Sequence, residues 1–173
     1  MKIILTGPPG TGKSEQATLI ANRYKIKHIS AGNLLREEIK QGTQIGKKVE
    51  KAVSDGDMAP DELVDEIVAK TIEKTEGFVL DGYPRDLNQA KIFDDFKIMI
   101  EIDTTEEEII KRLEKRKRSD DDINIVRHRF KVYKELTEPV LEYYSGTKKV
   151  EKVDGNGTIQ EVSKRIEKVL DNL

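Results

Sequence analysis

The sequence lacks residue types and patterns on which several classes of protein depend. It contains no cysteine and 2 histidines among 173 residues, which excludes disulfides and thiolate metal sites and leaves few ligands for zinc. No apolar run approaches the ~20 residues that a membrane-spanning helix needs, and the short apolar start does not predict a secretory leader, since it runs straight into glycines. We therefore expect a cytoplasmic protein that binds no membrane.

The chain also has no large excess of charge of either sign. The 31 Lys and Arg residues nearly balance the 33 Asp and Glu residues, for a formal net charge of −2, so the chain as a whole has no field to attract nucleic acid. Hydrophobic residues make up 36% and charged residues 37% of the chain. Because the apolar residues are clustered and periodic, this composition indicates a charged surface over an aliphatic core. The length suits one domain.

Short apolar runs alternate with helical patterns along the chain. Runs typical of buried strands lie at residues 3–5, 78–80, 98–100 and 150–153, and residues 14–24 repeat apolar side chains at helical spacing. Such alternation predicts an α/β fold with a mostly parallel sheet flanked by helices. Residues 31–74 read as three helices with no convincing strand, which predicts an inserted helical lobe. Residues 123–144 read as one long helix that Pro139 should kink.

A phosphate-binding loop follows the first predicted strand. The segment Gly7-Pro8-Pro9-Gly10-Thr11-Gly12-Lys13-Ser14 satisfies G-x-x-x-x-G-K-[ST] and opens a predicted helix. Glycines let the backbone N–H groups wrap a phosphate, Lys13 reaches the β- and γ-phosphates, and Ser14 is placed to meet Mg²⁺. The alternative is a glycine-rich turn with an incidental lysine. The motif alone does not separate a switch GTPase, an ATPase and a small-molecule kinase.

A second set of phosphate-binding residues lies farther along. Asp81 ends a predicted strand and Arg85 follows four residues later. An aspartate at this edge of the sheet suits Mg²⁺, directly or through water, and an arginine can grip a phosphate bidentately. Gly82 permits close approach of the backbone. Arg36 supplies another arginine on the first helix of the lobe.

These separated motifs together resemble those of the nucleoside monophosphate kinases, and most of all the adenylate kinases with a short lid. The resemblance covers nearly the whole chain and rests on GPPGTGK, HISAGNLLR, DELV, GFVLDGYPR, Gln89, the segment 118–121, TEPV and VDG. It implies the P-loop NTPase fold with core segments 1–29, 75–115 and 123–173, an NMP-binding lobe at 30–74, and a minimal lid at 116–122. It also implies Mg²⁺ as cofactor and ATP and AMP as substrates, with the oligomeric state left open.

The resemblance assigns a role to each matching position. The ATP-binding residues would be Gly7, Pro8, Pro9, Gly10, Thr11, Gly12, Lys13, Ser14, Arg116, Arg118, Asp154 and Gly155. The AMP-binding residues would be Ala31, Leu35, Arg36, Met58, Ala59, Val64, Gly82, Arg85, Gln89 and Arg129. Lys13, Arg85, Arg118 and Arg129 would be the catalytic residues that surround the migrating phosphoryl group with positive charge. Ser14 would hold the metal, and Asp81 would orient it through water.

The basic run at residues 111–118 divides into two parts under this reading. Six of its eight residues are cationic, and residues 111–115 are interpreted as a solvated helix surface. Arg116 and Arg118 would belong to the lid that folds over ATP, with Asp120 and Asp121 as their acidic partners. Only Lys117 separates the two arginines, so this lid would be shorter than in the short-lid relatives.

The expected reaction is direct in-line transfer from ATP to AMP, giving two ADP with no covalent intermediate. One alternative is a UMP/CMP kinase, since those relatives typically carry an alanine at the position of Ala31. Gln89 favours AMP, because an amide can hydrogen-bond the adenine edge. An alternative from another class is a non-catalytic P-loop regulatory module, against which the second set of phosphate-binding residues argues.

Overall fold

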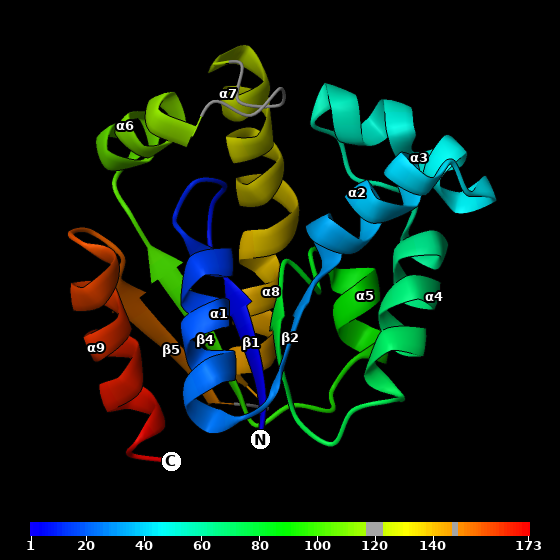
Figure 1. The fold of residues 1–173 in the computed structure, drawn as a ribbon. Coiled ribbons are helices and arrows are strands. Elements are labelled where there is room, and N and C mark those ends of the chain that lie inside the picture. The colour runs from blue at the N-terminus through cyan, green and yellow to red at the C-terminus, as the bar shows by residue number, and fades with distance from the viewer. Residues whose placement is uncertain (117–122, 147–148) are drawn as a thin grey trace.

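A central parallel sheet organises the computed structural model (Figure 1), which describes residues 1–116, 123–146 and 149–173. Its strands run in the order β2-β3-β1-β4-β5, and every pairing is parallel. The strands are β1 (Lys2–Thr6), β2 (Lys27–Ser30), β3 (Phe78–Asp81), β4 (Ile98–Asp103) and β5 (Lys149–Asp154). The predicted α/β class and parallel sheet are confirmed.

The inner strands are apolar because helices cover both faces of the sheet. On β1, Ile3 and Leu5 pack toward α1 (Lys13–Tyr24) and α9 (Ile159–Leu170). Ile4 points to the opposite face, toward α5 (Leu87–Ile92) and α8 (Glu138–Ser145). Since both α1 and β1 are fixed by this packing, the loop between them has a rigid base at the carboxyl edge of the sheet.

Strand β2 was not predicted from the sequence. Its residues Lys27, His28, Ile29 and Ser30 include only one large apolar side chain, and Lys27 is exposed. The strand lies at the edge of the sheet, where it pairs only with β3 among the described strands. An edge strand can stay polar, so it escapes a search for apolar runs.

Three helices follow β2: α2 (Ala31–Gln41), α3 (Gln44–Asp55) and α4 (Asp61–Ile72). The side chains of Ser30 and Thr43 cap α2 and α3 by accepting hydrogen bonds from backbone N–H groups. These helices stand to one side of the sheet (Figure 1) and share an apolar cluster with Phe78 and Leu80 of β3. The residues predicted as a helical lobe are therefore helical in the structure.

Beyond β4, α6 (Glu106–Arg116) precedes a helical segment made of α7 (Ile123–Val132), a π-helical turn η1 (Tyr133–Thr137) and α8. The backbone N–H of Glu138 donates to the carbonyl of Tyr133, five residues back. Pro139, with no N–H of its own, lies at the start of α8. The predicted single long helix is thus interrupted by a wider turn just before Pro139.

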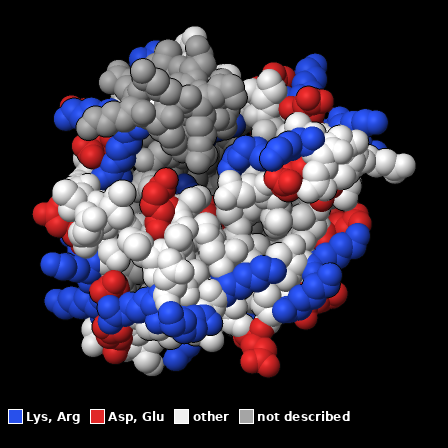
Figure 2. Space-filling model, viewed as in Figure 1, with Lys and Arg blue, Asp and Glu red and all other residues white. Residues whose placement is uncertain are grey.

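The surface shown in Figure 2 mixes Lys and Arg side chains with Asp and Glu side chains. Among the described residues, no helix is long and apolar enough to cross a bilayer.

Candidate active site

The loop between β1 and α1 turns sharply because of its glycines. Gly7 and Gly10 have φ angles of 140° and 86°. A Cβ on Gly7 would lie 2.5 Å from the carbonyl oxygen of Ile102 in β4, so only glycine fits there. Lys13 Nζ donates to the carbonyl oxygens of Gly7 at 2.6 Å and Pro8 at 2.7 Å. The loop therefore curls around the ammonium group at the N-terminus of α1, as phosphate binding requires.

Asp81 lies at the carboxyl end of β3, 4% exposed, and faces the start of α1. Its Oδ2 accepts hydrogen bonds from Ser14 Oγ and pairs with His28 Nε2, each at 2.9 Å. Burial alone would raise the pKa of Asp81, but the contact with His28, the charge of Lys13 and the Ser14 hydroxyl hold that pKa below its usual value. Asp81 is therefore a carboxylate at neutral pH.

The oxygens of Ser14 and Asp81 fit a hard cation. Carboxylate and hydroxyl oxygens are the ligand types that Mg²⁺ takes, and Mg²⁺ usually keeps several waters and phosphate oxygens as well. The described residues contain no group of three or more His, Cys, Asp or Glu side chains that could hold a metal. His28 was not predicted to take part, since the edge strand that carries it was missed.

Arg36 and Arg85 bring their guanidinium groups together beside Gly32. A Cβ added to Gly32 would lie 3.4 Å from Arg36 Nη1 and 3.6 Å from Arg85 Nη2. Burial lowers the pKa of Arg85, as do the positive charges of Arg129 and Arg36, against the opposing effect of Asp81. Several cations held so close to one another favour the binding of an anion.

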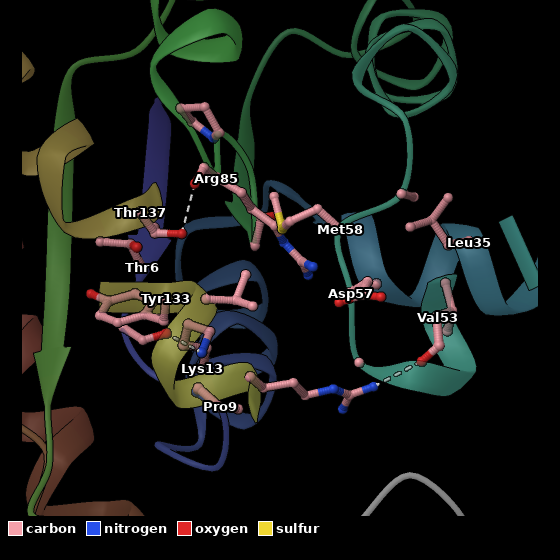
Figure 3. Close-up of a pocket in the computed structure, with 18 of the residues that line it drawn as sticks. Thr6, Pro9, Lys13, Leu35, Val53, Asp57, Met58, Arg85, Tyr133 and Thr137 are labelled. Atoms are coloured by element: carbon pink, nitrogen blue, oxygen red, sulfur yellow. Dashed lines mark hydrogen bonds between the residues drawn. The ribbon is translucent and has the colours of Figure 1, made fainter. Parts of the chain in front are cut away.

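One cavity, of about 160 Å³, joins these cations to the phosphate loop. Figure 3 shows Arg85 and Met58 extending into the same space that Lys13 faces. Arg129 reaches across it from α7, and its Nη2 donates to the carbonyl oxygen of Val53 at 3.2 Å. Of the predicted site residues, those that line the cavity are Gly7, Pro9, Lys13, Leu35, Arg36, Met58, Ala59, Gly82, Arg85 and Arg129.

Three of the predicted AMP-binding residues do not line this cavity. Ala31, Val64 and Gln89 are 1%, 6% and 1% exposed and pack behind it. Gln89 Oε1 accepts a hydrogen bond from the backbone N–H of Arg85 at 2.8 Å, and its Nε2 donates to Asp61 Oδ1 at 3.2 Å. In the structure, Gln89 thus supports the turn that presents Arg85.

A second cavity, of about 300 Å³, lies on the other side of the phosphate loop, between that loop, α6 and the start of α9. Arg112 lines it and donates to the carbonyl oxygens of Thr11 at 3.1 Å, Gly155 at 2.8 Å and Gly157 at 3.0 Å. The predicted nucleotide-contacting segment at Asp154 and Gly155 is therefore tied to the phosphate loop by one side chain.

Arg112 corrects the prediction for residues 111–115. The solvated-surface interpretation fits Lys111, which is exposed, but is wrong for Arg112, which is half-buried and hydrogen-bonded to three carbonyl groups. Nothing in the local sequence separates Arg112 from the other cations of this run. Arg116 ends α6, but its side chain, together with Arg118, Asp120 and Asp121, lies outside the described residues.

Comparisons with known proteins identify relatives of this chain by sequence. A family profile described as "Adenylate kinase" matches residues 5–149. An adenylate kinase of Mycolicibacterium vanbaalenii is 39% identical over 181 residues, covering 98% of this chain and 99% of its own. One from Petrotoga mobilis is 34% identical over 209 residues, covering 98% and 97%. One from Bacteroides fragilis is 36% identical over 188 residues and spans all of both chains.

Proposed function

Because the chain belongs to the adenylate kinase family, we propose that it transfers the γ-phosphoryl group of ATP to AMP reversibly, giving two ADP. The observation that carries this proposal is the pairing of Arg36 and Arg85 beside Gly32, in the same cavity that Lys13 faces. A protein that binds one nucleotide needs a single phosphate site. Two facing phosphate sites are what transfer between nucleotides requires.

The ATP side of the site combines the phosphate loop with the second cavity. The loop from Gly7 to Ser14 and the side chain of Lys13 would hold the ATP phosphates. Arg112, Asp154 and Gly155 would border the base and ribose beside the second cavity. Arg116 and Arg118, from the segment assigned to the lid, would close over the phosphates.

The AMP side uses the first cavity. Arg36 and Arg85 would bind the monophosphate, and Leu35, Met58 and Ala59 would contact the base. Ala31 and Val64 would pack behind the residues that contact the base. Gln89 would read the adenine edge through the hydrogen-bonding capacity that remains at its amide, which has a second N–H and a second lone pair.

The chemistry proposed is in-line attack by an AMP phosphate oxygen on the γ-phosphorus of ATP. Lys13, Arg85 and Arg129, with Arg118 of the lid, would offset the negative charge spread over the migrating group. Ser14, and Asp81 through water, would hold Mg²⁺ that binds with the nucleotide, and the metal would supply neutralisation of the phosphate charge. Closure of the lobe and lid would exclude water and so limit hydrolysis of ATP.

The deciding experiment measures nucleoside diphosphate formation with Mg-ATP and each of AMP, CMP and UMP. We expect the highest kcat/KM with AMP. A clear preference for CMP or UMP would instead favour the UMP/CMP kinase alternative that Ala31 suggested. Transfer to none of the three, with ATP still bound, would instead identify a regulatory P-loop protein.

A further inference from the structure

The turn that carries Arg85 is held at both of its peptide groups by side chains from other elements. The backbone N–H of Arg85 donates to Gln89 Oε1 at 2.8 Å. The carbonyl oxygen of Arg85 accepts from Thr137 Oγ1 at 2.7 Å, a hydrogen bond drawn in Figure 3. Its own Nε donates to the carbonyl oxygen of Gly82 at 2.7 Å. The direction of the Arg85 guanidinium therefore depends on the groups that fix this backbone.

The orientation of the Gln89 amide is set in turn by Asp61. Gln89 is buried, and its Nε2 donates to Asp61 Oδ1 at 3.2 Å. An ionised carboxylate only accepts hydrogen bonds, whereas an amide end either donates or accepts. With a carboxylate at residue 61, the Gln89 NH₂ group must face Asp61 and its oxygen must face the N–H of Arg85. The reversed amide would place two donors against each other at Arg85 and two acceptors against each other at Asp61.

A second contact joins the same helix to the same turn. Asp65 lies one helical turn beyond Asp61 on α4, and its Oδ1 accepts a hydrogen bond from the Tyr83 hydroxyl at 2.8 Å. Tyr83 is 3% exposed and immediately precedes the Pro84-Arg85 pair. Helix α4 of the lobe thus holds the Arg85 turn at two points, so the lobe and the phosphate-binding arginine are mechanically linked.

The carboxylate at Asp61 is maintained against its surroundings. Burial, a hydrogen bond with the Asp86 carboxyl group and the negative charges of Asp86 and Asp65 raise the pKa of Asp61 to about 6, with Asn88 acting the other way. Asp86 itself caps α5 by accepting from the N–H groups of Asn88 and Gln89. The folded protein binds a proton at Asp61 more tightly than the unfolded chain does, so the ionised form disfavours the fold at neutral pH.

We propose that Asp61 is a positioning residue for the acceptor phosphate site: its carboxylate fixes the orientation of the Gln89 amide, which holds the Arg85 turn in its phosphate-binding conformation. The inference rests on the proposed function and adds to it a residue that does not line the cavity. If residue 61 served stability alone, an uncharged asparagine would suit the position better, because asparagine has the same shape and is not repelled by Asp86. The presence of a charged residue at this position therefore points to a role in the site.

The test compares Asp61→Asn with Glu62→Gln, a matched change at the next residue, which is exposed in the same helical turn. At pH 7.5 we expect Asp61→Asn to raise the KM for AMP about fivefold, the ratio for exchanging a charged for a neutral hydrogen bond. The KM for ATP should not change, and the midpoint of thermal unfolding should rise. Glu62→Gln should alter neither the KM for AMP nor that for ATP.

The pH dependence separates positioning from a general structural role. As the pH falls through about 6, wild-type Asp61 becomes protonated, so the wild-type KM for AMP should approach that of Asp61→Asn. Titration of the AMP phosphate, near pH 6, affects all variants alike and cancels in the ratio of their KM values. An unchanged ratio across pH 5–8, an unchanged KM for AMP, or a lower unfolding midpoint for Asp61→Asn would each overturn the inference.

Failure of the proposed function would look different. In that case the wild-type protein itself would transfer no phosphate to AMP. Calorimetric titration of wild type and Asp61→Asn with AMP would then carry the test of Asp61. Equal AMP affinities would overturn the inference, and a weaker affinity for the variant would support it.

Discussion

Replacing Arg85 by methionine tests the second phosphate site most directly. Methionine keeps the length and apolar character of the side chain while removing the guanidinium and its positive charge. In the structure the head of Arg85 lies beside that of Arg36, where a phosphate can accept two hydrogen bonds from one guanidinium. A hydrogen bond to a charged group contributes about 1.5–3 kcal/mol, so the loss of two amounts to about 3–6 kcal/mol, or roughly 10²–10⁴-fold in kcat/KM.

Stability should respond in the opposite sense from activity. Arg85 is half-buried with Arg36 and Arg129 close by, and both desolvation and those charges lower its pKa. Without a phosphate, the three cations repel one another, so Arg85→Met should unfold at the same temperature as wild type or higher. The loss of the Nε bond to Gly82 is the opposing effect. Addition of AMP should raise the unfolding midpoint of wild type and not that of the variant.

A coupled assay of ADP formation measures kcat/KM. Thermal denaturation with and without AMP measures the unfolding midpoint. Arg23→Met is the matched control, because Arg23 pairs with Glu167 and Asp171 at the exposed junction of α1 and α9, away from the cavity. The control should keep its kcat/KM and its stabilisation by AMP. Arg85→Met activity within tenfold of wild type would refute the assignment of a phosphate to Arg85.

Three further changes test other parts of the site. Arg112→Ala should raise the KM for ATP about tenfold and leave the KM for AMP unchanged in steady-state kinetics, because three contacts to carbonyl groups beside the second cavity are lost. Gly7→Ala should lower the free energy of unfolding by about 2 kcal/mol or more in urea titrations, since its Cβ would meet the Ile102 carbonyl. Tyr83→Phe should cost about 1 kcal/mol in the same titrations, because it removes the donor to Asp65; an unchanged midpoint would contradict the proposed link between α4 and the Arg85 turn.

The sequence was sufficient for those parts of the fold and site that depend on local patterns. The strands with continuous apolar runs were identified, because burial on both faces leaves that signal. The phosphate loop was identified because its glycines, Lys13 and Ser14 lie within eight residues. Strand β2 was missed because an edge strand needs few apolar residues, and its loss concealed His28, which pairs with Asp81.

What could not be predicted depends on contacts between distant segments. Arg112 looks like any other cation in a charged run, and only the packing of α6 against the phosphate loop brings it to the carbonyl group of Thr11. Gln89 was assigned to the adenine through resemblance, whereas its contacts with Asp61 and the Arg85 backbone emerge only when α4 and α5 are placed side by side. The sequence motif identifies Gln89 as a site residue but does not tell which way its amide group is oriented.

The π-helical turn η1 has a consequence for how α7 and α8 divide their tasks. A π turn takes in about one residue more than an α turn, and one residue corresponds to roughly 100° around a helix axis. If Tyr133–Thr137 wound instead as an ordinary α-helix with no residue removed, the residues before it would turn by about one residue step around the axis relative to α8. Val140 and Tyr144 would keep α8 packed on the sheet, while Arg129 would swing through roughly that angle, out of line with the cavity. The wider turn thus sets the angular offset between α7 and α8. With this offset, α8 packs its apolar side chains on the sheet while α7 directs Arg129 toward the cavity.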